Sequence, residues 1–287
     1  MTIKDNQLLP PEYQKIVGMI LGSETQKMLP TGIMFYGPKE TAKNIIADEL
    51  SNCLLQKKNK EIHPDELILE PKLENVNIGI EDVREFISSF SSSPLVASRR
   101  VGIIRSADML TIQSQNALLK TLEEPPQQSC MMLIADDATK ILPTVQSRLT
   151  KIYIPTLSQN SYQLYLHTQH IAIPTKELLS YCVGRVERTI QMQKTDDSSL
   201  ALFAKEVYQN IRSNSTRIFL YTQKNKKIDS HDLTQCIPYL IHCAHQDLFK
   251  NSGDSFSRHF LSALLEYVTH PLNRNLQLKL ENVCLQD

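Results

Sequence analysis

The sequence predicts an α/β domain with a mostly parallel sheet, followed by a second half made of helices. Two observations lead to this prediction. Short apolar runs alternate with amphipathic helical segments up to Pro155, and strand-like runs become rare after it. Strands that alternate with helices are typical of a parallel sheet covered on both faces.

Five short runs with strand character make up the predicted sheet, at residues 32–36, 65–71, 100–105, 130–135 and 151–155. Amphipathic segments between them predict helices at residues 42–55, 80–90 and 111–124. The second of these carries apolar residues at the i, i+3, i+4, i+7 spacing of one helical face. The third is expected to end before Pro125, because proline cannot continue a helix.

Helical periodicity dominates the rest of the chain. Residues 176–193 indicate two helices that meet at Gly184, and residues 196–211 have a capping-type helix start. Further helices are expected over residues 214–282, with breaks near Asp229, Gly253 and Pro271.

The composition is that of an ordinary globular protein, and the formal net charge is zero. Of the 287 residues 41% are hydrophobic, and 31 basic residues balance 31 acidic ones. Dedicated nucleic-acid binders usually carry a basic excess, so the charge balance argues against that class. The N-terminal residues show no secretory signal and no apolar run reaches membrane-spanning length, so we expect a cytoplasmic protein without membrane contact.

The six cysteines are scattered and form no C-x-x-C pair. Without paired spacing a zinc site is not expected, and the simplest interpretation is small buried side chains in a reducing compartment.

Residues 35–44, FYGPKETAKN, form an altered phosphate-binding loop. The nucleotide-binding pattern is G-x-x-x-x-G-K-[ST]. Gly37 and Lys43 match it, but Ala42 replaces the second glycine and Asn44 replaces the hydroxyl that ligates Mg²⁺. Glu40 would also repel phosphates. We therefore expect a structural turn that does not bind nucleotide, with Lys43 solvated or paired.

A second altered position follows the strand at residues 100–105. An ATPase needs two acids at its end, one for the metal and one to polarise water. Arg105 and Ser106 stand there instead, and Arg105 is a cation where Mg²⁺ would sit.

A third feature is the Ser147–Arg148 pair at the end of a short predicted helix. An arginine at a domain edge can stabilise the charge on a γ-phosphate held by a neighbouring subunit. The alternative is a surface or structural salt bridge.

Several of these segments occur together in one order, namely FYGPKETAK (35–43), HPD (63–65), IGIEDVREF (78–86), NALLKTLEEPP (116–126) and ILPTVQSRL (141–149). Together they resemble the delta-prime subunits of bacterial DNA polymerase III clamp loaders, within the AAA+ superfamily. NALLKTLEEPP is the most specific segment. The resemblance covers the chain to about residue 155, and in the last 90 residues it rests on NRNLQLKLEN (273–282).

The resemblance implies three parts, which are an AAA+ α/β base with a degenerate phosphate loop (1–156), a small all-α lid (157–197) and an all-α collar (198–287). It implies a place in a pentameric ring with the tau/gamma motors and the delta subunit. That ring opens the beta sliding clamp and places it on primed DNA, so DNA contact by this chain is expected to be at most indirect.

The resemblance also implies a subunit that is not itself an ATPase and holds no ATP. The family's Ser-Arg-Cys motif supplies an arginine finger to the adjacent motor. Here the motif is Ser147-Arg148-Leu149, so Arg148 is the predicted trans-acting finger. Asp136 and Asp137 stand where active relatives place a γ-phosphate sensor, which is a third feature unfavourable to ATP binding.

Two departures from the family leave questions open. Relatives usually carry a four-cysteine zinc module before HPD, whereas this chain has only Cys53 there, so no zinc is expected. A lid arginine reads nucleotide in active relatives. Arg185 and Arg188 are both available for that position, with Glu187 between them, and neither is assigned.

Other functional classes remain possible. An active AAA+ ATPase motor would need the Mg²⁺ ligands that positions 44 and 105 lack. A metabolic P-loop kinase would not need a terminal helical domain. A bare scaffold, in which Arg148 has no catalytic role, is the remaining alternative.

Overall fold

The computed structural model describes residues 9–25, 29–57, 62–72, 77–169, 171, 182–194, 204–209, 212–213 and 230–269. The chain divides into two compact units. The first lies within residues 1–172 together with 183–189, and the second within 173–182 and 190–287. The predicted boundaries at residues 156 and 197 are a different division, and they stay a prediction.

The first unit is built on one parallel sheet of five strands in the order β2-β3-β4-β1-β5. These are β1 Gly32–Tyr36, β2 Glu66–Leu69, β3 Arg100–Ile104, β4 Ser129–Ala135 and β5 Thr150–Tyr153. Every residue of β3 and β4 is buried. Strands covered on both faces read as continuous apolar runs, which is why the sequence predicted these two so clearly.

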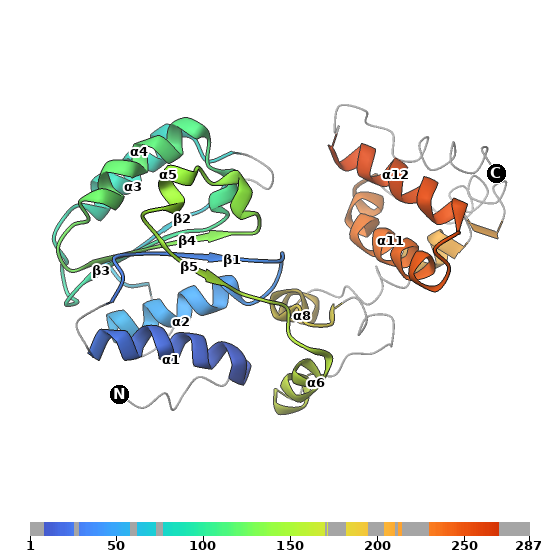
Figure 1. Ribbon diagram of the computed structural model, residues 1–287, viewed down its shortest axis with the longest axis horizontal. Helices are drawn as coiled ribbons and strands as arrows, with labels where there is room; N and C mark the ends of the chain where they lie inside the picture. Colours follow the sequence, from blue (N-terminus) through green and yellow to red (C-terminus); the bar gives the residue numbers. More distant parts are fainter. Residues whose placement is uncertain are drawn as a thin grey trace. The chain divides into compact units, whose positions relative to one another are not determined.

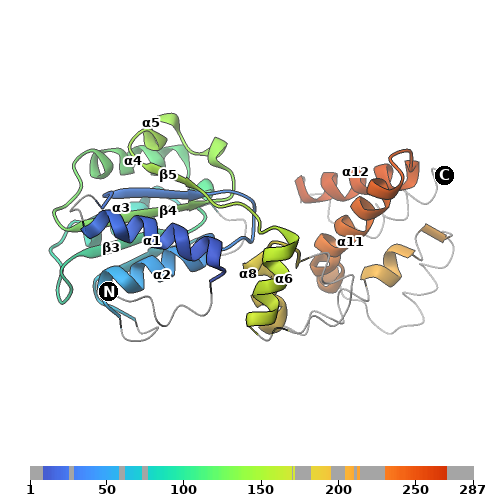
Figure 2. The same ribbon diagram turned by 60° about the horizontal axis from the view of Figure 1, so that its bottom comes forward.

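Helices cover both faces of this sheet (Figure 1). On one face α1 Pro11–Thr25 and α2 Lys43–Leu55 lie side by side, as both views show (Figure 1, Figure 2). On the other face lie α3 Ile80–Phe90, α4 Ile112–Glu123 and the short α5 Pro143–Gln146. The sequence had predicted α2, α3 and α4 to within a few residues and a short helix ending near Ser147, but it had not predicted α1.

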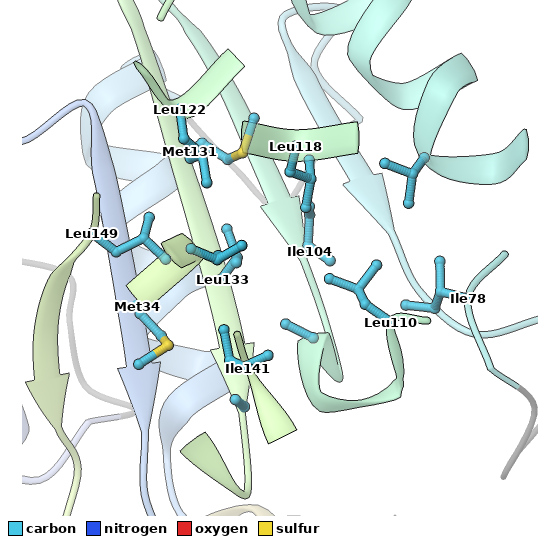
Figure 3. Close-up of a cluster of buried hydrophobic side chains, with 14 of the residues drawn as sticks. Met34, Ile78, Ile104, Leu110, Leu118, Leu122, Met131, Leu133, Ile141 and Leu149 are labelled. Carbon is cyan, nitrogen blue, oxygen red and sulfur yellow. The ribbon is translucent and has the colours of Figure 1, made fainter. Parts of the chain in front are cut away.

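The ends of α4 follow from its sequence. The side chain of Thr111 accepts a hydrogen bond from the backbone N–H of Ser114, which caps the N-terminus. At the other end Glu124 closes the last turn, and Pro125 follows. Leu118 and Leu122 of this helix face Met131, Leu133 and the rest of a buried cluster beneath it (Figure 3).

The strand predicted at residues 65–71 is shorter than expected and covers Glu66–Leu69. At its start Asp65 is not part of the strand, and its side chain binds a neighbouring loop. Its side chain is fully buried and accepts three backbone N–H groups, from Leu95 at 2.6 Å, Val96 at 2.8 Å and Ala97 at 2.7 Å. Arg100 adds a contact at 3.3 Å. Asp65 therefore holds the loop that leads into β3.

The chain continues from the sheet into α6 Gln159–Thr168 and α8 Val186–Lys194. The Tyr162 hydroxyl of α6 is hydrogen-bonded to Thr189 of α8 at 2.6 Å, within the first unit. Gly184 lies just before α8, where the sequence predicted a junction; the helix predicted before it lies outside the described residues apart from Cys182 and Val183.

The second unit contains α11 Ser230–Lys250 and α12 Ser255–Thr269, which pack together (Figure 1). Tyr208 packs against the rings of Phe256 and Phe260, and its hydroxyl contacts Ser257 at 2.9 Å. The segment 273–282 and Cys284 lie outside the described residues. The assignment of these helices to a lid and a collar stays a prediction.

Candidate functional site

The loop between β1 and α2, predicted to be an altered phosphate-binding loop, has two residues with positive φ. Gly37 has a φ of 145°, and a Cβ added there would lie 2.3 Å from the carbonyl oxygen of Ile154. Glu40 has a φ of 60°, in the left-handed region. The first glycine of the motif is therefore required by the turn itself, whether or not nucleotide binds.

Lys43 is buried and paired. Its side chain is 1% exposed, and Nζ lies 2.8 Å from Oδ1 of Asp136. The same ammonium group donates to the carbonyl oxygen of Gly37 at 3.1 Å, to that of Pro38, and to the hydroxyl of Thr41 at 3.3 Å. Of the two expectations for Lys43, solvated is wrong and paired is correct. The lysine that would meet a phosphate instead neutralises a carboxylate of its own chain.

Asn44 is also engaged within the chain, by Glu187. The Glu187 carboxylate accepts the backbone N–H of Asn44 at 2.7 Å and the side-chain amide of Asn44 at 3.0 Å. The pKa of Glu187 is raised above its ordinary value, because burial disfavours its charged form. Hydrogen bonds from Asn44 and the backbone N–H of Ile45, together with the charge of Lys43, act in the opposite direction and are smaller. Ala42, at the N-cap, is fully buried and its side chain makes no capping bond.

The two arginines that the sequence left unassigned both reach this loop. Arg188 forms an ion pair with Glu40, and both side chains are largely buried. Arg185 donates to the carbonyl oxygen of Lys39 at 2.8 Å. The repulsive carboxylate predicted at Glu40 is thus neutralised by α8.

Arg105 and Ser106 follow β3 as predicted, but the structure builds an ion-pair group around the arginine. Arg105 lies 2.9 Å from a carboxylate oxygen of Asp48 and 3.4 Å from one of Glu70. Burial raises the pKa of Asp48 and the charge of Arg105 lowers it. Ser106 has a φ of 51° and begins the turn after the strand. Acidic residues are present here, on α2 and after β2, and they serve as partners of the arginine.

The two acids after β4 have separate roles. Asp136 pairs with Lys43, as described above. Asp137 caps a short turn, accepting the backbone N–H of Thr139 at 2.9 Å, and its hydrogen bonds with Thr139 lower its pKa. The sequence grouped them as one feature, and only Asp136 reaches the loop.

Arg148 and Ser147 lie at the end of α5, as predicted. They are next to the start of β1, whereas the phosphate loop follows the end of that strand. The Arg148 carbonyl oxygen lies beside Gly32 at the start of β1. Four residue steps along a strand span about 13 Å. Arg148 is therefore not positioned to contact a nucleotide in its own loop.

The guanidinium group of Arg148 is held on the surface by its own chain. It donates to Glu123 through Nε at 3.0 Å, and to the carbonyl oxygen of Thr144 at 2.6 Å and the Ser147 hydroxyl at 3.3 Å through Nη1. Its side chain is 32% exposed and that of Glu123 is 50% exposed. The salt-bridge alternative for Arg148 is thus present in this structure, at a position that is partly exposed to solvent.

Within the described part of the chain, no group of three or more His, Cys, Asp and Glu side chains is arranged to hold a metal ion. Cys53 lies on α2, partly buried, next to Glu49. None of the described helices combines the length and apolar character needed to cross a membrane. The absence of zinc stays a prediction.

The sequence did not reveal the role of Glu187. Its only signal was an acid between two arginines at the start of a helix. Its partner Asn44 is 143 residues away, and the contact depends on the tertiary fold.

The sheet order and the flanking helices define an α/β domain of the AAA+ type, in which Lys43, Asn44 and Glu40 of the loop after the first strand contact other residues of the chain. A family model described as DNA polymerase III, delta subunit, matches residues 13–158, just over half of the chain. The chain belongs to this family.

Comparisons with individual proteins agree with that assignment. The chain is 31% identical over 93 residues to the DNA polymerase III subunit delta' of Pseudomonas aeruginosa, which covers 32% of this chain and 28% of that protein. It is 30% identical over 144 residues to the subunit tau/gamma of Haemophilus influenzae, covering 47% of this chain and 20% of that protein. The chain thus spans well under two thirds of the length of these relatives.

A solved structure extends the likeness beyond the sheet. A DNA polymerase III gamma subunit-related protein from Thermotoga maritima superposes with a TM-score of 0.59 at 18% identity, covering 96% of this chain and 97% of that one. This likeness shows a shared fold.

Proposed function

We propose that this chain is a clamp-loader subunit of DNA polymerase III that does not hydrolyse ATP itself and that offers Arg148 to a nucleotide held by a neighbouring motor subunit. In this role it has an AAA+ base at 1–156, a lid at 157–197 and a collar at 198–287. Its partners are the tau/gamma and delta subunits. Through the ring it serves the beta sliding clamp, with at most indirect contact to DNA, in the cytoplasm.

The observation that carries the first half of the proposal is the pairing of Lys43 with Asp136. A lysine that binds phosphate must direct its charge at the phosphate oxygens. Here a carboxylate 2.8 Å away already neutralises it, and the position expected to bind Mg²⁺ holds Arg105. Neither ATP nor a metal is therefore proposed as a cofactor.

Calorimetry of the purified chain with Mg-ATP tests this half. We expect no saturable binding at millimolar nucleotide. Micromolar affinity would favour the alternative function, an active AAA+ motor subunit, for which the tau/gamma likeness is the supporting observation. Metal analysis of the same sample is expected to find no stoichiometric zinc.

The second half rests on the position of Arg148 at the amino end of β1, on the opposite side from its own loop. An arginine finger stabilises charge on the transferred phosphoryl group and contributes about 10³–10⁵ to the rate where such fingers have been measured. Glu123 holds the guanidinium group, and exchange of that carboxylate for a phosphate of a partner keeps its charge compensated.

The test is a ring reconstituted with Arg148→Ala. We expect the clamp- and DNA-stimulated ATP hydrolysis rate of the ring to lose the contribution of the one motor site that Arg148 completes. The ring itself should still assemble. Arg84→Ala is the matched control, because Arg84 is an exposed arginine of α3 paired with Glu81. An intact ring with an unchanged rate would leave a scaffold as the function of this chain.

A further inference from the structure

The N-terminus of α2 has no capping side chain from its own segment. The first N–H groups of a helix lack partners within the helix and carry partial positive charge. Ala42 occupies the N-cap and cannot accept a hydrogen bond through its side chain. The carboxylate of Glu187 takes this role instead, accepting the backbone N–H of Asn44 at 2.7 Å.

This carboxylate meets a donor of the kind that binds anions at helix N-termini. In a phosphate-binding loop the phosphate meets the backbone N–H groups at the N-terminus of the following helix. One oxygen of Glu187 accepts such a backbone N–H, that of Asn44 at 2.7 Å, and the other accepts the side-chain amide of Asn44 at 3.0 Å.

Two further contacts, one from the start of α8 and one from the residue before it, reach the same loop. Arg188 pairs with Glu40, and the exposed fractions of the two side chains are 15% and 23%. Arg185 donates to the carbonyl oxygen of Lys39 at 2.8 Å. All of these residues belong to the first compact unit. Arg185, Glu187 and Arg188, which lie at and just before the start of α8, thus each meet a loop group of opposite polarity.

We propose that Glu187 is an internal substitute for a nucleotide phosphate, and that together with Arg188 it fastens the first turn of α8 to the phosphate loop without any nucleotide. This lock is a property of the single chain. It does not depend on the clamp-loader role proposed above, so it can fail or hold independently of that role.

Hydrogen–deuterium exchange on the full chain tests the lock. In Glu187→Ala we expect the amides of Asn44 and Ile45 to exchange about tenfold faster, because they lose a charge-assisted acceptor. The β3 amides at 101–104 should be unchanged, which shows that the fold is intact. Glu124→Gln, at an exposed glutamate after α4, is the matched control. Unchanged exchange at 44 and 45 would overturn the proposal.

Inorganic pyrophosphate tests whether Glu187 occupies an anion site. We expect it to slow exchange at Asn44 and Ile45 in Glu187→Ala and not in the native chain. If pyrophosphate protects these amides equally in both proteins, or protects them in neither, the proposal that Glu187 takes the place of a phosphate is wrong. Glu187→Gln keeps the shape and removes the charge, and it gives the same readout if the alanine variant does not fold.

A charge exchange tests the second contact. Glu40→Arg alone should speed exchange across residues 182–190, because it places two arginines together. Adding Arg188→Glu should restore the slow exchange. A double variant that exchanges as fast as the single one would show that the ion pair does not fasten α8.

Discussion

The ammonium group of Lys43 lies 2.8 Å from a carboxylate oxygen of Asp136, and the lysine side chain is almost completely buried. Lys43 stands at the start of α2 and Asp136 directly after β4, so the pair links two elements that a nucleotide phosphate would otherwise approach. We expect Asp136→Asn to lower the free energy of unfolding by about 1–2 kcal/mol, because the buried ammonium keeps only neutral acceptors.

Chemical denaturation measures this change, with Glu124→Gln as the control for loss of an exposed carboxylate. The loss should persist in high salt, because a partly buried pair is weakly screened. A loss no larger than that of the control would mean that the pair does not stabilise the loop.

Gly37 should be intolerant of any side chain, even though the loop is not expected to bind nucleotide. Its φ of 145° is unfavourable for other residues, and an added Cβ would lie 2.3 Å from the Ile154 carbonyl oxygen. We expect Gly37→Ala to lower the free energy of unfolding by more than about 1 kcal/mol.

Gly18→Ala provides the contrast within the same unit. Gly18 lies inside α1 with no heavy atom within 4 Å of the added Cβ, so alanine there should stabilise the chain by up to about 1 kcal/mol. Equal effects of the two substitutions on the thermal midpoint would contradict the structural role assigned to Gly37.

Asp65 should make the stability of the first unit depend on acid. Burial alone would raise the pKa of Asp65, but three backbone N–H groups and Arg100 lower it to about 2. Because the folded-state pKa lies below the unfolded value, this stabilisation is fully present above about pH 4 and is lost as the pH falls toward 2. The shift corresponds to about 2 kcal/mol.

Unfolding measured from pH 6 to pH 2.5 checks this prediction against Asp65→Asn. The native chain should lose stability more steeply than the variant across the acid range. Parallel pH curves would show that Asp65 titrates normally and that the contacts with the loop at residues 95–97 contribute no stability.

Arg105 should not be replaceable by the acid that an ATPase would carry there. Asp48 and Glu70 lie next to it, so Arg105→Asp would bring three carboxylates together. We expect this variant to be less stable than Arg105→Gln by about 1 kcal/mol at neutral pH, because the groups are partly exposed and solvent screens them. The difference should shrink at pH 3, where carboxylates gain protons, and a difference that persists there would point to a cause other than charge.

Much of the first unit could be predicted from local sequence. Apolar runs of strand length and a helical spacing of apolar residues are local properties, so β1, β3, β4 and α4 were found close to their observed ends. Two elements differed from the prediction. Asp65 lies outside the predicted strand because it binds the backbone of residues 95–97, which is a long-range contact. Helix α1 was not predicted, although Tyr13, Val17 and Ile20 are buried at helical spacing.

The sequence by itself showed which residues stand in the phosphate loop, at the end of β3 and at the end of β4, and from these single positions it predicted that the chain does not bind Mg-ATP. It also placed Arg148 after a short helix. Only the tertiary structure decided what the replacement residues do. Lys43 meets Asp136, Glu40 meets Arg188 and Asn44 meets Glu187. The reason is physical: buried or partly buried charges require partners, and in a parallel α/β fold those partners come from segments far apart in the chain.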